Sequence, residues 1–218
     1  MQINPKDQAK KENDRLLIGS VLPRPIAFVT SLNEEGKVNA APFSFFTVVS
    51  SDPPMLAVTV NRKPGGVQKD TARNIAAYKE YVIQVVDGEN VEQVNQCATD
   101  FPPEMSEAEA VGFDVVPGQK VKVPRIVQSK IQMECRLHQI LSMGGTAAEP
   151  NADLVIGEVA LFHVRDDLYE QGRIDSETLD PVGRLAGLSF GKIGETFSRR
   201  RLSYKEWQER EKSKSSRS

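Results

Sequence analysis

The chain has 218 residues, of which 39% are hydrophobic and 27% charged, and its formal net charge at pH 7 is -2. This composition is typical of an ordinary globular protein with one sizeable domain, or at most two small ones. The small net charge excludes the strongly basic field through which many proteins attract nucleic acid. No apolar run approaches the roughly 20 residues of a membrane-spanning helix, and the charged N-terminus lacks an apolar signal core. We therefore expect a cytoplasmic protein with no membrane or nucleic-acid partner.

Strand signals follow a polar N-terminal segment. Pro23 and Pro25 prevent a helix and favour an extended backbone that leads into the first strand. Hairpin-like turns separate the next strands, which predicts an antiparallel meander. Pro42 cannot donate to a ladder, so the second strand is either one bent strand or two pieces broken near that residue. The expected strands are Ile26 to Ser31, Val38 to Ser50 and Met55 to Asn61.

Short helices are expected in the middle of the chain. Asp70 or Thr71 can cap the first of them, and Ala72, Ile75 and Ala76 recur at helical spacing. The expected helices are Lys69 to Glu80, Glu89 to Ala98 and Met105 to Val111, and a strand from Tyr81 to Val86 lies between the first two.

Two long strands are expected later in the chain. From Val127 to Leu141 nearly all odd positions are apolar and the even positions are polar, which predicts one buried face and one face toward water or a partner. Leu154 to Val164 is apolar in both phases, as in a central strand. Strand-rich order without βαβ alternation favours an antiparallel barrel over a Rossmann sheet. We expect one domain over residues 1–200 and a charged, helical to disordered tail over residues 201–218.

Metal and disulfide chemistry has little support. The chain has two cysteines and two histidines. Cys97 and Cys135 form no CxxC pair, and His138 and His163 lie in strand-like segments. These residues are too few for a disulfide framework or a structural zinc site, so we expect no metal.

Small polar side chains interrupt the early apolar strands. Thr30, Ser31 and Ser44 stand where a strand that needs only burial prefers Val, Ile or Phe. We infer that a polar ligand lies against the sheet.

Five motifs make the chain similar to a known family. The segments RPIAFVTS, NAAPFSFF, SDPP, KDTARNI and DPVGRLAGLSF resemble the flavin reductase-like, FMN-binding split-barrel family, between about Pro23 and Phe197. The resemblance implies a mainly β fold, an antiparallel six-stranded split barrel with short peripheral helices. It also implies a homodimer with FMN near the subunit interface. Ala186 and Phe190 stand where Gly and Tyr are more usual, so a tyrosine hydroxyl near the flavin is missing.

An FMN phosphate suits the segment Lys69 to Thr71. Backbone N–H groups and the dipole at a helix start favour an anion, Lys69 adds a charge and Thr71 adds a hydroxyl. Arg62, in the preceding loop, can add another cation. We assign Asp70 to capping the helix, because its charge is unfavourable beside a phosphate; the alternative is a plain capped helix without a ligand.

Other residues of the motifs suit the isoalloxazine ring. Asn39 and Ser44 can form hydrogen bonds at its polar edge, although bulge and turn chemistry explains Asn39 equally well. Phe45 and Phe46 point to opposite sides of a strand, so one is core and the other covers the flavin or packs at a subunit seam. The resemblance places Arg184 beside the flavin; the alternative is a surface arginine in a Gly-rich loop.

The resemblance implies an NAD(P)H:flavin oxidoreductase, in which a hydride passes from NADH or NADPH to FMN. No GxGxxG fingerprint is present, so the nicotinamide would bind over the flavin and not on a Rossmann domain. The alternative is a flavoredoxin-like FMN electron carrier, or a flavin-binding module, that docks on a redox partner protein and does not use NAD(P)H. A barrel without any cofactor is a third hypothesis. No catalytic residue is assigned, because the cofactor carries the chemistry.

Overall fold

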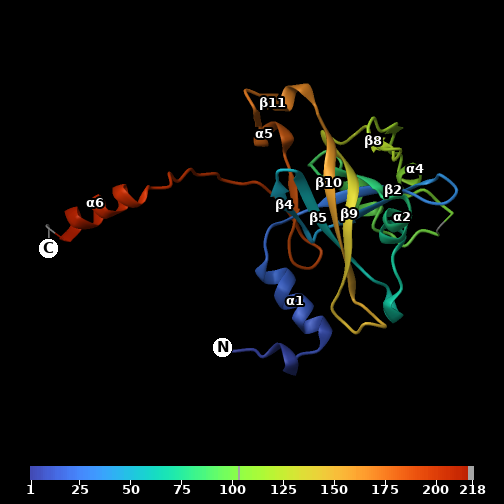
Figure 1. Cartoon of the computed structure of the whole chain (residues 1–218), viewed down its shortest axis with the longest axis horizontal. Coiled ribbons are helices and arrows are strands. Elements are labelled where there is room, and N and C mark those ends of the chain that lie inside the picture. The colour runs from blue at the N-terminus through green and yellow to red at the C-terminus, as the bar shows by residue number, and fades with distance from the viewer. Residues whose placement is uncertain (103, 216–218) are drawn as a thin grey trace.

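Seven antiparallel strands form the main sheet (Figure 1) of this computed structural model, which describes residues 1–102 and 104–215. Their order is β3-β2-β6-β9-β10-β5-β4. The mainly β architecture is confirmed, but this sheet has seven strands where six were expected. The strands are β2 Ala27–Leu32, β3 Val38–Phe43, β4 Phe46–Ser51, β5 Pro54–Asn61, β6 Glu80–Val85, β9 Ile131–Met143 and β10 Ala152–Val164.

The two edges of this sheet are neighbours in the chain. β3 ends at Phe43 and β4 begins at Phe46, yet the two strands occupy opposite ends of the strand order. Consecutive Cα atoms are about 3.8 Å apart, so these residues are separated by at most about 11 Å. The sheet must therefore curl until its edges meet at Ser44 and Phe45, where the Phe45 carbonyl accepts from the Thr59 N–H at 2.8 Å. The expected meander is wrong, because the two hairpins β2–β3 and β4–β5 lie at opposite edges.

Both faces of β2 are buried. Ala27 and Val29 join the core inside the curled sheet, whereas Ile26 and Phe28 join a second cluster outside it. Three short helices lie against this half of the sheet: α2 Asp70–Tyr78, α3 Val91–Gln96 and α4 Glu107–Ala110. The expected helices are confirmed with tighter bounds.

The first half of β9 departs from the expectation of one face toward water or a partner. It begins at Ile131, and all of its first five side chains are buried. Glu134 accepts backbone N–H groups from Gln119, Lys120 and Val121 at 2.8, 2.5 and 3.0 Å, and His163 Nε2 lies 2.7 Å away. The preceding loop therefore covers the polar face of this first half, where Gln132 and Glu134 anchor the loop, whereas Arg136 and His138 farther along β9 are exposed, as expected.

A smaller sheet of three strands, in the order β1-β13-β14, lies beside the main sheet. Beyond it, the chain runs away from the body as a C-terminal arm of residues 193–215 that ends in α6 (Figure 1). The helix falls in the expected charged tail, and the disorder expected at its end lies outside the described residues.

The remaining elements are η1 Pro5–Asp7, α1 Lys10–Ser20, β1 Arg24–Pro25, η2 Pro64–Gly66, β7 Val115–Val116, β8 Arg125–Ile126, η3 Asp166–Leu168, β11 Tyr169–Glu170, β12 Arg173–Ile174, α5 Ser176–Leu179, β13 Val182–Arg184, β14 Phe190–Lys192 and α6 Tyr204–Ser215. Within the described ranges, no helix is long and apolar enough to cross a membrane.

Candidate flavin site

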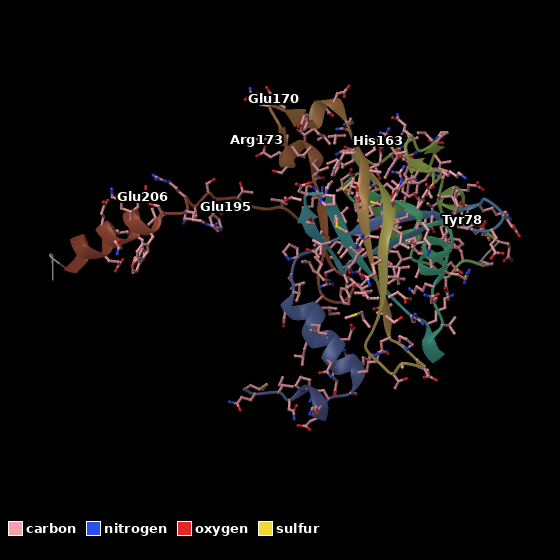
Figure 2. The ribbon with its side chains drawn as sticks, viewed as in Figure 1. Tyr78, His163, Glu170, Arg173, Glu195 and Glu206 are labelled. Carbon is pink, nitrogen blue, oxygen red and sulfur yellow. The ribbon has the colours of Figure 1, made fainter. Side chains whose placement is uncertain are left out.

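Two polar pairs join the first turns of α2 to the sheet. Asn39 Nδ2 of β3 donates to Thr71 Oγ1 at 3.1 Å, and Asn74 Nδ2 donates to Ser31 Oγ of β2 at 3.2 Å. All four side chains are buried. The structure therefore brings three of the predicted site residues, Ser31, Asn39 and Thr71, to one end of this helix. The opposite end is marked by Tyr78 in Figure 2.

The helix α2 starts without a side-chain cap. Lys69 is the N-cap residue, its backbone is extended, and no side chain accepts from the first turn at this position. The expectation that Asp70 caps the helix is wrong, because its carboxylate pairs with Arg73 instead. Lys69 is exposed and forms none of the ion pairs found among the described residues. An exposed ammonium group and an uncapped helix start are thus adjacent.

The guanidinium of Arg62 is already engaged. Its Nε and Nη2 donate to the Asp153 carboxylate at 3.0 and 2.5 Å, and its Nη1 donates to the Gly66 carbonyl at 3.0 Å. The Asp153 side chain has no exposed surface, and that of Arg62 is 14% exposed. Arg62 therefore orders the loop that leads to Lys69, and its charge is neutralised.

Thr30 points away from this helix. Its Oγ1 donates to the Pro124 carbonyl at 2.8 Å, and the Gln84 amide lies 3.0 Å from the same oxygen. Neighbouring residues of a strand face opposite sides, so Ser31 faces α2 and Thr30 faces the loop around Pro124. The structure does not bring Thr30 together with the other candidates.

A second group of candidates surrounds the corner between β3 and β4. A cavity of about 250 Å³ lies here, lined by Ile26, Pro42, Phe43, Ser44, Val94, Asn95, Ala98, Arg184 and Phe190. The Arg184 guanidinium lies 4.4 Å from the centroid of the Phe190 ring, and its Nη2 donates to the Gly187 carbonyl at 2.8 Å. Ser44 and Arg184, far apart in the sequence, thus line one cavity.

The two phenylalanines of this corner have different environments. Phe46 packs against the core inside the sheet. Phe45 is partly exposed, and the Arg24 guanidinium carbon lies 6.0 Å from the centroid of its ring. Phe46 is therefore the core residue of the pair, and Phe45 is free to meet a ligand.

Arg24 is a residue of this region that the sequence analysis did not single out. It is only 5% exposed, and its guanidinium donates to the carbonyls of Ile18, Val21 and Leu185. Its Nε is buried and has no hydrogen-bond partner. Burial and the neighbouring Arg184 lower its pKa. The sequence carried one indication that Arg24 is buried, because Arg24 is a charged residue between two prolines and directly precedes a strand that is buried on both faces.

A cavity next to Asn39 and Asn74, the two amides that pair with Thr71 and Ser31, has acidic walls. It has a volume of about 360 Å³ and is lined by Asn33, Glu34, Glu35, Lys37, Val38, Asn39, Asp70, Arg73, Asn74, Phe101, Glu104, Met105 and Glu107. Five carboxylates against two basic side chains disfavour a phosphate inside this cavity, so an anion at the start of α2 would lie outside it, beside the exposed Lys69. Among the described residues, no group of three or more His, Cys, Asp or Glu side chains is placed to hold a metal ion.

Comparisons with known proteins match these features to a family. Residues 18–179 match the family model of the flavin reductase like domain. The structure of nitrilotriacetate monooxygenase component B from Bacillus cereus is similar, with a TM-score of 0.89 and 43% identity over 91% of this chain and 98% of that chain. Pseudomonas fluorescens 2-nitrobenzoate 2-nitroreductase NbaA gives a TM-score of 0.83 and 33% identity over 94% of this chain and 98% of that one.

A third comparison concerns the fold alone. A putative flavin reductase with split barrel domain from Shewanella frigidimarina NCIMB 400 has a TM-score of 0.79 at 19% identity, over 93% of this chain and all (100%) of that chain. The curled sheet is therefore similar in fold to this split-barrel structure. The matched residues 18–179 include the whole main sheet, the start of α2 and the β3–β4 corner, and the chain belongs to the flavin reductase-like family.

Proposed function

We propose that this protein binds one FMN per subunit and acts as an NAD(P)H-dependent flavin reductase. Membership of the flavin reductase-like family supports an oxidoreductase. The single observation that carries FMN as the flavin is the uncapped start of α2, where the exposed Lys69 lies beside the buried Asn39–Thr71 pair.

The residues at this end of α2 fit a phosphate group. The free N–H groups and dipole of a helix start favour an anion, and an ammonium group adds a charge-assisted hydrogen bond. Thr71 accepts from Asn39, which leaves its own hydroxyl proton available for a phosphate oxygen. One compact phosphate site suits FMN better than FAD.

The isoalloxazine ring would lie toward the β3–β4 corner. Ser44 lies five positions after Asn39, and a strand rises about 3.3 Å per residue, so about 16 Å separates the two ends of the site. A ribityl phosphate followed by a three-ring system is of that order of length. Ser44, Phe45 and Arg184 are then the residues that orient the ring. When bound, FMN supplies the hydride-accepting chemistry.

An anaerobic reduction assay tests the proposal. The purified yellow protein is mixed with NADH or NADPH without oxygen, and the flavin absorbance is followed. We expect bleaching within seconds with at least one of the two nucleotides. A flavin that is reduced by dithionite but by neither nucleotide would contradict NAD(P)H use and favour a flavoredoxin-like carrier that takes electrons from a protein. Failure of the colourless protein to take up added FMN would contradict flavin binding itself.

We also infer that the protein is a homodimer. The C-terminal arm carries large apolar side chains into solvent: Phe197 is 78% exposed, Tyr204 71% and Trp207 50%. A projecting arm with three exposed aromatic residues favours contact with another chain. The second half of β9, where Leu141 and Met143 are 38% and 46% exposed, offers further apolar surface.

Light scattering tests this assembly. We expect twice the subunit mass at micromolar concentration. A monomer mass, with FMN fully bound, would show that the subunit is sufficient and that the homodimer is wrong. A redox partner protein is proposed as well, because the similar Bacillus cereus protein is named component B of a monooxygenase.

A further inference from the structure

Two arginines lie opposite each other in the small sheet, close to the β3–β4 corner. In the strand register, Arg24 of β1 lies opposite Arg184 of β13. Within the described residues, both guanidinium groups donate to backbone carbonyls, and neither forms an ion pair. Like charges that lie directly opposite one another destabilise a pair of strands. A negative charge at this corner would therefore stabilise the pair.

The charge of Arg24 is fixed in place. The residue is 5% exposed, and its guanidinium donates to the carbonyls of Ile18 and Val21, at the end of α1, and of Leu185, directly after β13. Its Nε is buried and has no hydrogen-bond partner. Because carbonyls from two distant parts of the chain hold the group, it needs no reorganisation when a charge develops nearby.

The surroundings of the two arginines hold little negative charge. No carboxylate is among the residues that line the cavity at the β3–β4 corner, and none lines a neighbouring cavity of about 290 Å³, which shares Ile26 with it. Burial and Arg184 lower the pKa of Arg24, and the Asp14 carboxylate opposes them with a smaller effect. Apolar walls weaken the screening of charges, so both arginines act more strongly here than in water.

Both charges lie close to the place that the proposed function gives to the flavin ring. Arg184 lines the cavity itself. The guanidinium carbon of Arg24 lies 6.0 Å from the centroid of the Phe45 ring, and Phe45 is one of the residues proposed to orient the flavin. A ring held at this corner therefore lies within the field of both arginines.

The charge of a flavin changes when it accepts a hydride. A hydride carries two electrons and one proton, so a neutral ring that takes it up gains one negative charge unless it binds a further proton. We propose that Arg24 and Arg184 together stabilise this negative charge and thereby favour reduced over oxidised FMN. The inference rests on the proposed function, because it needs a flavin ring at the β3–β4 corner. It deepens that function by giving a role to Arg24, which does not line the cavity.

The ratio of the affinities for reduced and oxidised FMN tests this role. It follows from the midpoint potentials of bound and free FMN, measured without oxygen by dithionite titration of the full-length protein with a reference dye. Arg24→Met removes the charge and should lower the ratio, reduced over oxidised, by roughly tenfold or more. A tenfold change is a shift of about 30 mV in a two-electron potential. Arg24→Lys keeps a positive charge and should change the ratio less.

The conservative variant separates charge from structure. Both substitutions at Arg24 disturb its bonds to carbonyls, so both should lower the melting temperature. A purely structural arginine would lower the melting temperature in both variants without moving the ratio. If Arg24→Met does not fold, Arg184→Met takes its place, because that guanidinium donates to one carbonyl and is half-buried.

A matched control is Arg173→Met, in an exposed arginine of the β11–β12 hairpin (Figure 2). It should leave the ratio unchanged, and an equal shift in this variant would overturn the role of the pair. The same titrations with riboflavin should show the same shifts in the arginine variants, because the new charge is on the ring and not on the phosphate.

Two outcomes would overturn this inference alone. The first is bound FMN with the same ratio in the variants of both arginines as in the unaltered protein. The second is a constant ratio with weaker binding of FMN but not of riboflavin, which would mean that the pair holds the phosphate. Bound FMN that neither NADH nor NADPH reduces would contradict the proposed activity and, with the expected ratios, leave this role supported. A protein that binds no FMN would contradict both.

Discussion

Asp153→Ala should lower the free energy of unfolding by about 3–5 kcal/mol, because it leaves the charge of Arg62 without its buried partner. Two nitrogens of this guanidinium donate to the Asp153 carboxylate, whose side chain has no exposed surface. The pair also fastens the end of β5 to β10, since Arg62 directly follows Asn61, the last residue of β5, and Asp153 belongs to β10. Removing one partner of such a pair costs far more than the net worth of the pair.

Urea unfolding followed by circular dichroism measures this effect. The matched control is Asp167→Ala, which removes an equally well-formed pair with Arg165 that is exposed, with side-chain exposures of 54% and 45%. Exposed pairs contribute little to stability, so the control should leave the free energy of unfolding nearly unchanged. If both variants lose the same stability, then burial does not determine the strength of the Arg62 pair, and the prediction is wrong.

The sequence was sufficient for most local elements of this fold. Alternating and continuous apolar runs predicted β2, β5, β6 and β10 within one or two residues, and β10 is central, between β9 and β5, as expected. Helical spacing of Ala72 and Ile75 predicted α2, and both residues join the core. These signals are local, because each depends on side-chain period within one element.

The long-range arrangement could not be predicted in the same way. Pro42 suggested a break near it, and the chain does break at Ser44–Phe45, but the sequence did not indicate that the two pieces lie at opposite edges of the sheet. That outcome depends on pairing between distant strands. Glu134 looked solvent-exposed for the same reason, because the N–H groups that cover it belong to the loop around Lys120, 14 residues away in the chain.

The predicted site residues also divide into those that depend on local sequence signals and those that depend on distant partners. Alternation predicts that Thr30 and Ser31 face opposite sides, but only the packed helix shows that Ser31 is the residue facing α2. Arg62 looked like an available cation because its partner Asp153 is 91 residues away. The prediction for Lys69 depended only on its place directly before a helix. Lys69 is also the candidate cation that is exposed beside the helix start.

The variant Lys69→Ala/Thr71→Ala should bind FMN roughly ten- to a hundredfold more weakly, while its affinity for riboflavin changes little. The loss corresponds to about 1.5–3 kcal/mol for a charge-assisted hydrogen bond. Riboflavin has no phosphate, so it does not use this end of α2. Thr71→Ala should also lower the stability of the fold, since it leaves the buried Asn39 amide without its hydrogen-bond acceptor. Lys69→Ala alone is therefore the cleaner variant, because that side chain is exposed.

Fluorescence titration of the flavin-free protein with FMN and with riboflavin measures both affinities. The matched control is Lys63→Ala, a lysine of the same loop that pairs with Asp100 at 3.5 Å. The ratio of FMN to riboflavin affinity in the Lys63→Ala variant should equal that of the unaltered protein. If the ratio also stays constant in Lys69→Ala and in the double variant, the phosphate does not bind at α2. Arg184 then becomes the next candidate, because it is half-buried, lines a cavity and has no acidic partner among the described residues.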